Sequence, residues 1–185
     1  MNANIVIVGV GGQGILLTSR ILGAMALNLG MDIKVSEVHG MSQRGGSVIT
    51  HVRIGEKVFS PLIDPHEADY VVSFEYLEAL RAQAYLKDGG TLIVNQQKIM
   101  PMPVISGLAV YPETPLKAGR VIEIDALDTA RKAGSAKAVN IVLLGVLAKQ
   151  LGQDRALWEK AVAQCVPEKT IQINLAAFGA GFDNL

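Results

Sequence analysis

Two glycine-rich loops, each placed after a segment that is expected to form a strand, constrain the fold of this chain more than any other feature. In the first loop, Gly9, Gly11 and Gly14 match the pattern G-x-G-x-x-G directly after a β-branched run. The second loop has the sequence HGMSQRGG at residues 39–46 and follows the next segment that is expected to form a strand. A glycine motif between a buried strand and a helix is typical of the first turn of a parallel α/β sheet. Because the carboxyl ends of parallel strands meet at one edge of a sheet, we expect both loops to open at the same edge.

Hydrophobic patterning along the chain alternates between short buried strands and helices. Strands are expected at residues 5–8, 33–38, 47–54, 70–74, 91–95 and 121–124. Helices are expected at residues 15–29, 75–85, 141–151, 154–165 and 168–182. The strand at 5–8, the helix at 15–29 and the strand at 33–38 should form a βαβ unit. The alternation predicts a doubly wound, mostly parallel α/β sheet of the Rossmann-like type with a helical C-terminal region, and Asp125 is suited to cap the helix after the last strand. The 185 residues fit a single domain that spans 1–185.

Two departures from this alternation are expected. Residues 47–54 turn through 55–57 into a second short strand expected at 58–60, and this pattern predicts a β-hairpin excursion. Residues 96–119 contain four of the seven prolines and should form an irregular excursion, with a short strand near 108–111.

The charge balance and the cysteine content exclude several classes of function. The chain has 17 basic and 17 acidic residues, so its formal net charge of zero argues against a surface for nucleic acid or anionic membranes. Cys165 is the only cysteine, and the chain cannot build an iron–sulfur cluster or a four-cysteine zinc site from it. His66 lies near Asp64, Glu67 and Asp69, but this spacing matches no metal-ligand motif, so no metal site is predicted.

The apolar segments and the start of the chain bear on its location. Gly, Asn or Arg interrupts each apolar stretch before it reaches the length of about 20 residues that a membrane-spanning helix needs. The first four residues lead directly into a strand and show no basic leader or cleavage site. We therefore expect a cytoplasmic protein with no membrane partner.

The first glycine loop has the residue types of a nucleotide or phosphate site. In such loops the first glycine permits a tight turn, the second lets a ligand approach the backbone, and the third allows close contact between helix and strand. Free N–H groups at the start of the following helix favour an anion. We therefore predict a cofactor-binding loop, although a tight turn required only by the fold has the same pattern. The residues of this predicted loop are Gly9, Gly11, Gly12, Gln13 and Gly14.

Glu37 bears on the choice of cofactor. It lies 23 residues after Gly14, close to the spacing of about 20 at which an acidic residue binds the ribose in dinucleotide sites. It also runs directly into the second loop, where its carboxylate can anchor the loop through a hydrogen bond. Both roles stay open from the residues alone.

The second loop carries three side chains suited to polar recognition. Arg44 can pair with a carboxylate or phosphate through two parallel hydrogen bonds, and His39 can donate a hydrogen bond or move a proton near neutral pH. Gln43 adds an amide to the same rim. The alternative is a solvated loop with an ordinary surface arginine, but the expected position beside the first loop favours a site.

The second loop resembles that of the small subunits of the 2-oxoacid:ferredoxin oxidoreductases, and within that family the β subunits of the indolepyruvate enzymes. The resemblance rests on the twelve residues EVHGMSQRGGSV at 37–48. Further similarity lies in SPLI at 60–63, in Phe-Glu at 74–75 with EAL at 78–80, and in NIVLLG at 140–145. The likeness extends over nearly the whole chain.

This resemblance implies a subunit of an enzyme that oxidatively decarboxylates a 2-oxoacid and releases an acyl-CoA. The implied substrates are indolepyruvate and related aryl pyruvates from aromatic amino acid catabolism. A large α subunit is expected to carry thiamine diphosphate, Mg and [4Fe–4S] clusters and to pass electrons to ferredoxin, with coenzyme A as co-substrate. This chain alone is expected to hold no cofactor and to be inactive. The resemblance places His39, Gln43, Arg44 and Asn140 in an active site that this chain completes.

Two other functions remain open at this point. The chain could be a stand-alone dinucleotide-binding oxidoreductase that uses Gly9, Gly11, Gly14 and Glu37. It could also be a non-catalytic scaffold whose glycine loops only dock a partner.

Overall fold

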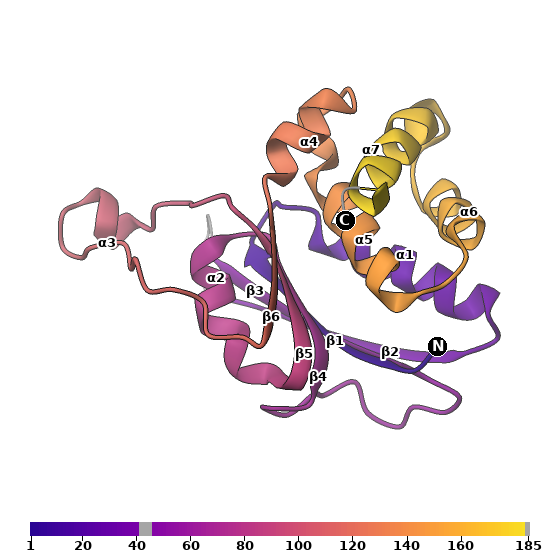
Figure 1. Ribbon diagram of the computed structural model, residues 1–185, viewed down its shortest axis with the longest axis horizontal. Helices are drawn as coiled ribbons and strands as arrows, with labels where there is room; N and C mark the ends of the chain where they lie inside the picture. The colour runs from indigo at the N-terminus through magenta and orange to yellow at the C-terminus, as the bar shows by residue number, and fades with distance from the viewer. Residues whose placement is uncertain (41–45, 184–185) are drawn as a thin grey trace.

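The computed structural model describes residues 1–40 and 46–183, and these residues form one mixed β-sheet with helices on both faces (Figure 1). The strands are β1 (Ala3–Val10), β2 (Asp32–His39), β3 (Ser47–Gly55), β4 (Ala68–Ser73), β5 (Leu86–Asn95) and β6 (Arg120–Ile124). The longer helices are α1 (Ile15–Asn28), α2 (Tyr76–Ala82), α4 (Ala126–Lys132), α5 (Val139–Leu151), α6 (Arg155–Cys165) and α7 (Ile171–Asp183). The short helical segments are η1 (Gln83–Tyr85), α3 (Met102–Ile105), η2 (Ala136–Ala138) and η3 (Glu168–Thr170).

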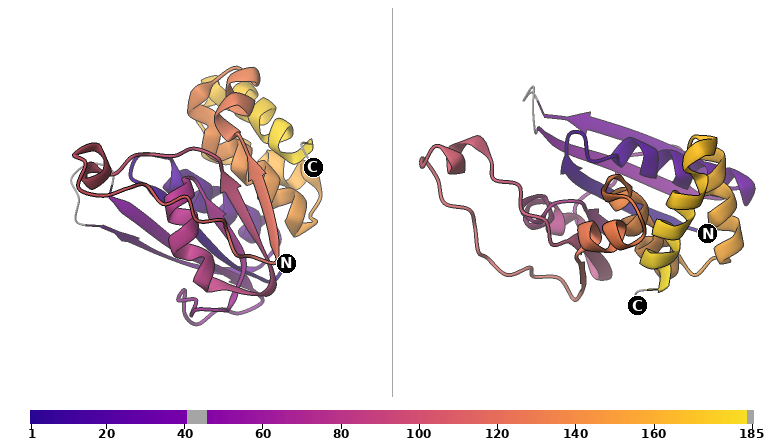
Figure 2. Two further views of the ribbon diagram at one scale, coloured as in Figure 1. Left: turned by 60° about the vertical axis from the view of Figure 1, so that its left-hand side comes forward. Right: turned by 90° about the horizontal axis from the view of Figure 1, so that it is seen from above.

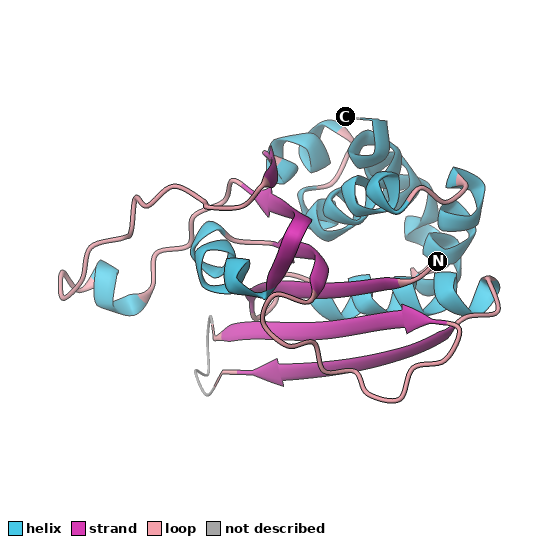
Figure 3. Cartoon of the chain, turned by 60° about the horizontal axis from the view of Figure 1, so that its bottom comes forward, coloured by secondary structure: helices cyan, strands magenta, loops and turns pink. Residues whose placement is uncertain are grey.

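The sheet has the strand order β2-β3-β1-β4-β5-β6. The pairs β1–β4, β4–β5 and β5–β6 are parallel, whereas β3 runs antiparallel to both β1 and β2. β1 and β2 therefore point in the same direction, and their carboxyl ends lie at the same edge of the sheet. Figure 3 shows the β2–β3 pair as two long antiparallel arrows.

Both faces of the sheet are covered at β1, and this explains the uninterrupted apolar run in that strand. Ile5 and Ile7 point into a core formed with α1, α5, α6 and α7, whereas Val6 and Val8 point into a second core formed with α2. Strands buried on both faces lack the polar alternation of a half-exposed strand. α1 is likewise apolar on most sides because it packs on the sheet and also against α6.

The structure confirms the mixed, mostly parallel α/β architecture and the helical C-terminal region. The predicted cap is confirmed as well, since the Asp125 side chain accepts a hydrogen bond from the Asp128 N–H at the start of α4. Within the described part of the chain, no helix combines the length and the apolar character that a membrane crossing requires.

Two local expectations were wrong, and a third was met with a difference. The hairpin is formed by β2 and β3, and residues 58–60 form no strand because the Val58 N–H donates to Asp32 Oδ2 instead of joining a ladder. The predicted βαβ unit is present, since α1 connects β1 to β2 and the two strands run in the same direction, but β3 is inserted between them. Residues 108–111 form no strand, since the N–H groups of Leu108 and Ala109 donate to the Pro103 carbonyl and close a tight turn after α3.

Candidate functional site

The ends of the two glycine-rich loops lie side by side at the edge formed by the carboxyl ends of β1 and β2. The Gly11 N–H donates a hydrogen bond of 3.0 Å to the Gly46 carbonyl, and the Gly40 N–H donates one of 2.7 Å to the Ser47 carbonyl. The expectation that both loops open at one edge is therefore confirmed. In an open α/β sheet this is the edge at which ligands bind.

The first loop has a backbone that requires glycine at two positions. Gly12 and Gly14 have φ angles of 95° and 85°, which residues with a Cβ rarely adopt. A Cβ on Gly14 would also lie 2.7 Å from Asn140 Nδ2, whereas a Cβ on Gly12 would meet nothing within 4 Å. Gly14 is thus fixed by packing, and Gly12 presents open backbone to the space above the loop.

The Gln13 side chain turns back into the fold. Its Oε1 accepts a hydrogen bond of 2.7 Å from the Val10 N–H, and its Nε2 donates to the Phe74 carbonyl at 3.1 Å and to Gln97 Oε1 at 3.4 Å. Gln13 thereby joins the ends of β1 and β4, whose connections leave to opposite faces of the sheet. That position between oppositely directed connections is the crevice in which doubly wound folds place ligands.

Asn140 lies against the same loop although it is far away in the sequence. It is buried in the first turn of α5, and its Nδ2 donates a hydrogen bond of 3.3 Å to the Gly14 carbonyl. The structure therefore brings Asn140, Gln13 and the glycine backbone together, as the resemblance implied. In this geometry Asn140 positions the loop.

A cavity of about 340 Å³ opens beside the first loop. One wall is the loop, and the opposite wall is formed by the segment that leads into α5 and by the start of α7. Its polar lining comes from Gln13, Ser135, Lys137, Asn140, Thr170 and Asn174. Sequence reasoning missed all of these except Gln13 and Asn140, because Ser135, Lys137, Thr170 and Asn174 stand in no recognisable motif.

His39 is the one second-loop side chain of the predicted site that the structure describes, because Gln43 and Arg44 lie outside the described residues. His39 Nε2 lies 2.7 Å from Glu37 Oε1, and the other carboxylate oxygen of Glu37 accepts a hydrogen bond of 2.9 Å from the Thr50 hydroxyl. Glu37 thus has the anchoring role left open by the sequence. Its strand is separated from β1 by β3, so Glu37 does not stand next to the first glycine loop as the acid of a dinucleotide site does.

Two buried glutamates support this edge, and the sequence showed them only as part of the resemblance. Glu75 is 1% exposed and accepts hydrogen bonds from the N–H groups of Glu78 and Ile99 and from the Tyr111 hydroxyl, at 3.0, 2.9 and 2.6 Å. Burial, together with the hydrogen bond to Glu75, raises the pKa of Tyr111 above its ordinary value, so the phenol stays protonated and donates. A buried carboxylate requires such donors, and Glu75 is therefore a structural anchor.

Glu78 links the start of β3, directly after the second loop, to α2. Its Oε2 accepts a hydrogen bond of 2.6 Å from the hydroxyl of Ser47, the first residue of β3, and its Oε1 lies 2.7 Å from a guanidinium nitrogen of Arg81. Both acids follow closely after a buried strand in the sequence, and this position is the signal by which they could have been identified. The sequence alone does not reveal their partners, which lie 24 or more residues away in three cases.

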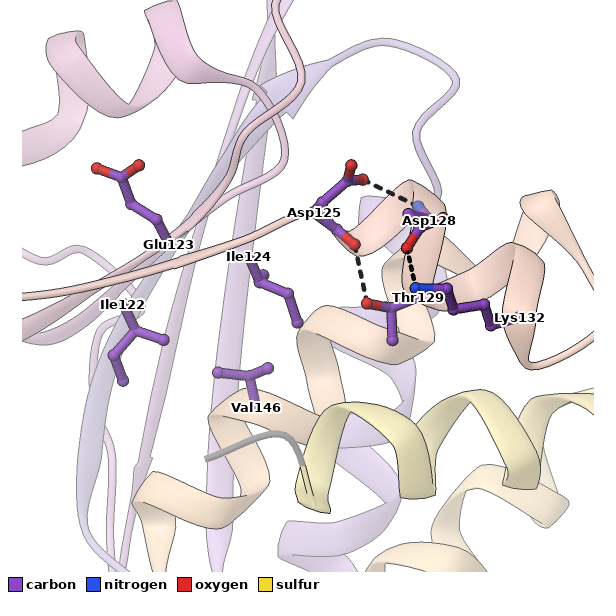
Figure 4. A pocket seen from close by; sticks show the side chains of 8 residues that line it. All are labelled: Ile122, Glu123, Ile124, Asp125, Asp128, Thr129, Lys132 and Val146. Carbon is purple, nitrogen blue, oxygen red and sulfur yellow. Dashed lines mark hydrogen bonds and ion pairs between the residues drawn. The ribbon is translucent and has the colours of Figure 1, made fainter.

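A second cavity, of about 320 Å³, lies at the end of β6 (Figure 4). Its polar groups are already engaged in capping and pairing α4. Asp125 accepts from the Asp128 N–H, Thr129 donates to the Asp125 carbonyl, and Lys132 pairs with Asp128 at 2.6 Å. Glu123 points away from this cluster in Figure 4, so the lining does not converge on one point.

Comparison with known proteins identifies the family to which this chain belongs. The family model described as pyruvate ferredoxin/flavodoxin oxidoreductase matches residues 4–184. The chain is 43% identical to indolepyruvate oxidoreductase subunit IorB of Thermococcus kodakarensis, over 96% of this chain and 93% of that protein. It is 40% identical to the IorB subunit of Archaeoglobus fulgidus, over 99% and 95% of the two chains.

A solved structure shares the fold over nearly the whole length. The gamma subunit of a keto/oxoacid ferredoxin oxidoreductase from Geobacter sulfurreducens superposes with a TM-score of 0.76 and 27% identity, over 98% of this chain and 96% of that one. Similar sequence also occurs inside a longer chain. Ketoisovalerate oxidoreductase subunit VorA of Methanothermobacter thermautotrophicus is 31% identical over 95% of this chain, but the match covers only 35% of VorA. The chain described here therefore belongs to the pyruvate ferredoxin/flavodoxin oxidoreductase family.

Proposed function

We infer that this chain is the small subunit of an indolepyruvate ferredoxin oxidoreductase and acts in the cytoplasm together with a large α subunit. As a single domain spanning 1–185, it completes the active site with the edge that carries its two glycine-rich loops. The observation that carries the proposal is the hydrogen bond of 3.0 Å between Gly11 and Gly46, because it brings the ends of both loops to the ligand-binding edge of the sheet. The 43% identity to an IorB subunit supports indolepyruvate and related aryl pyruvates as the substrate class.

The overall reaction consumes a 2-oxoacid, coenzyme A and two oxidised ferredoxins. The bond between the carboxylate and the carbonyl carbon breaks, carbon dioxide leaves, and the acyl group forms a thioester with coenzyme A. Two electrons pass to ferredoxin and one proton is released. The large subunit supplies the chemistry of thiamine diphosphate with Mg and of the [4Fe–4S] clusters, since one cysteine in this chain cannot hold a cluster.

The residues of this chain bind and orient in this proposal. Arg44 holds an anionic group of substrate or cofactor, and His39 donates a hydrogen bond from the same rim. The backbone of the first loop at Gly12 and Gly14 faces a second anionic group, with coenzyme A as the candidate, because the N–H groups of Val10, Gly11 and Gln13 already donate within the fold. Gln13 and Asn140 keep this loop in its shape through their bonds to Phe74 and Gly14, and through the loop they orient the polar groups bound there.

Reconstitution tests the proposal. The wild-type chain is mixed with the purified large subunit of the same organism, and ferredoxin reduction is followed with indolepyruvate and coenzyme A. We expect no turnover from either subunit alone and turnover from the mixture. An active chain alone, or an inactive mixture in which the large subunit holds its cofactors, contradicts the proposal.

The Arg44→Ala variant tests the role of the second loop. Loss of a charge-assisted pair should lower the turnover of the complex at least tenfold, which corresponds to about 1.4 kcal/mol. The melting temperature of the free subunit should not change. The matched control is Arg120→Ala, since Arg120 is exposed at the start of β6, at the opposite edge of the sheet. Full turnover by the Arg44 variant would show that this residue is not part of the site. If every loop variant forms the complex normally and keeps full activity, the result supports the scaffold function instead.

A further inference from the structure

The segment between β5 and β6, residues 96–119, forms an arm that projects away from the sheet with α3 near its tip (Figures 1 and 2). Its central residues, 99–112, contain no charged residue and no histidine. The side chains of Leu108 and Val110 are 85% and 90% exposed, and those of Met102 and Ile105 are 70% and 65% exposed. Single exposed apolar side chains are ordinary, but a continuous exposed apolar segment indicates an interaction surface.

The arm holds its own shape at the tip. The N–H groups of Leu108 and Ala109 donate to the Pro103 carbonyl at 2.8 and 3.0 Å, and Gly107 ends α3 with a φ angle of 73°. An apolar segment that is already ordered loses less conformational entropy on binding than a flexible one does. The tip is therefore suited to insertion into a preformed groove.

The base of the arm is attached to the candidate site. Both limbs bind the same buried carboxylate, because the Ile99 N–H and the Tyr111 hydroxyl donate to Glu75 Oε1 at 2.9 and 2.6 Å. Gln97 accepts a hydrogen bond of 3.4 Å from Gln13 of the first glycine loop. The base of the arm and the first glycine loop are therefore held by one hydrogen-bond network at the same edge of the sheet.

We propose that this arm is the clasp by which the chain binds the large α subunit, with residues Met102, Ile105, Leu108 and Val110 seated in an uncharged apolar groove of that subunit. This inference rests on the proposed function. Lack of charge along residues 99–112 calls for an apolar groove, because a charged groove would lose its hydration without gaining a partner. The attachment at Gln13 and Glu75 places the base of the arm beside the glycine-loop edge, so a partner that binds the arm is brought next to that edge. The large subunit is the partner that completes a site at the glycine-loop edge, whereas a second copy of this chain would block that site.

The relation to longer chains agrees with this choice. In VorA the sequence similar to this chain makes up 35% of a longer polypeptide, so the rest of that polypeptide is available to cover the corresponding surface. In the present chain the arm is exposed, and a separate subunit must cover it.

The double variant Leu108→Glu with Val110→Glu tests the clasp. Affinity for the purified large subunit is measured by titration of ferredoxin-linked turnover and by sedimentation. We expect the apparent Kd to rise at least tenfold, with turnover restored at saturating subunit, because two charges are forced into an apolar groove. The free variant should keep the wild-type melting temperature, since both side chains lie in solvent. A milder pair, Leu108→Ser with Val110→Ser, should weaken binding in the same direction.

The matched control is Phe59→Glu. Phe59 is 84% exposed but lies after β3, at the opposite edge of the sheet from the glycine loops, so its substitution should leave the Kd unchanged. A wild-type Kd for both arm variants overturns the clasp. A free wild-type dimer that the arm variants dissociate, with unchanged affinity for the large subunit, assigns the arm to a second copy and also overturns it. Failure of the wild-type chain itself to bind the large subunit refutes the proposed function, and this outcome is visible without any variant.

Discussion

At the scale of single residues, the polar side chains buried near the sheet are held by specific hydrogen bonds. Asn140 and Gln13 fix the glycine loop, and Glu75 fixes the arm. His51 does the same for the loop after β3, since its Nδ1 accepts a hydrogen bond of 3.0 Å from the Ile63 N–H. This bond requires an unprotonated Nδ1, so the neutral imidazole is the form that fits the fold.

The stability of the chain should therefore depend on pH through His51. Burial lowers the pKa of His51 in the folded chain, although nearby Asp64 opposes the shift. Because the unfolded chain then binds the proton more readily, the free energy of unfolding should fall as the pH drops through the ordinary histidine pKa of about 6.5. Above that pH the stabilisation is fully present.

Urea unfolding between pH 7.5 and pH 5 measures this effect. The variant His51→Asn keeps an acceptor for the Ile63 N–H but does not titrate, so its stability should decrease less steeply than that of the wild type. The control is His66→Asn, because His66 is exposed and its φ angle of 66° suits asparagine. Equal slopes for the wild type and the His51 variant would show that His51 does not contribute to the pH dependence.

At the scale of elements, the crossing of α5 and α7 sets how the C-terminal helices cover the sheet. Gly145 in α5 and Gly181 in α7 lie where the two helix backbones meet. A Cβ on Gly145 would lie 2.3 Å from the Phe178 carbonyl oxygen, and a Cβ on Gly181 would lie 2.0 Å from the Val142 carbonyl oxygen. Neither contact is possible without moving a helix, so the glycines allow the close approach.

Alanine at either glycine should destabilise the fold. Forced separation of packed helices costs about 1–3 kcal/mol or more, which exceeds the gain in helix propensity of about 1 kcal/mol. The matched control is Gly23→Ala in α1, where a Cβ meets nothing within 4 Å, and there the free energy of unfolding should rise. Thermal and urea unfolding of the three variants shows whether each substitution raises or lowers the free energy of unfolding. A stabilising Gly145→Ala or Gly181→Ala would show that the helices do not pack as closely as described.

At the scale of the whole molecule, the strand order decides which kind of ligand the glycine edge can bind. The insertion of β3 between β1 and β2 moves Glu37 one strand away from the first glycine loop, and Glu37 pairs with His39 and Thr50. The acid that binds the ribose in a dinucleotide site stands on the strand next to the glycine loop. The arrangement of this sheet therefore disfavours a stand-alone dinucleotide enzyme.

Nicotinamide dinucleotides should not stabilise the free chain. A ligand that binds the folded state at a concentration of 100 times its Kd adds about 2.7 kcal/mol, which shifts the melting temperature of a chain of this size by several degrees. We expect no shift with NAD or NADP at 1 mM in differential scanning calorimetry. The Glu37→Gln variant should behave like the wild type in this assay. A shift that depends on NAD and disappears in the Glu37 variant would support the dinucleotide function.

Local patterning was enough to locate most of the strands and helices and to place the two glycine-rich loops at one edge of the sheet. Periodicity identifies a buried strand or a helix because burial depends on residue type, and caps such as Asp125 are local. The glycine loops were recognisable for the same reason, since a turn with positive φ at Gly12 and Gly14 depends on nearby residues only.

The folded chain was needed to establish which strands are neighbours, which groups Gln13, Asn140 and Glu75 bind, and that the side chains at the tip of the arm are exposed. Hydrophobic patterning specifies the faces that a strand buries but not the strand beside it, so the position of β3 between β1 and β2 could not be read from sequence. The partners of Glu75 and Asn140 come from segments 24 to 126 residues away, and such contacts exist only after the chain has closed. Long-range packing, not local preference, therefore gives this edge its chemistry.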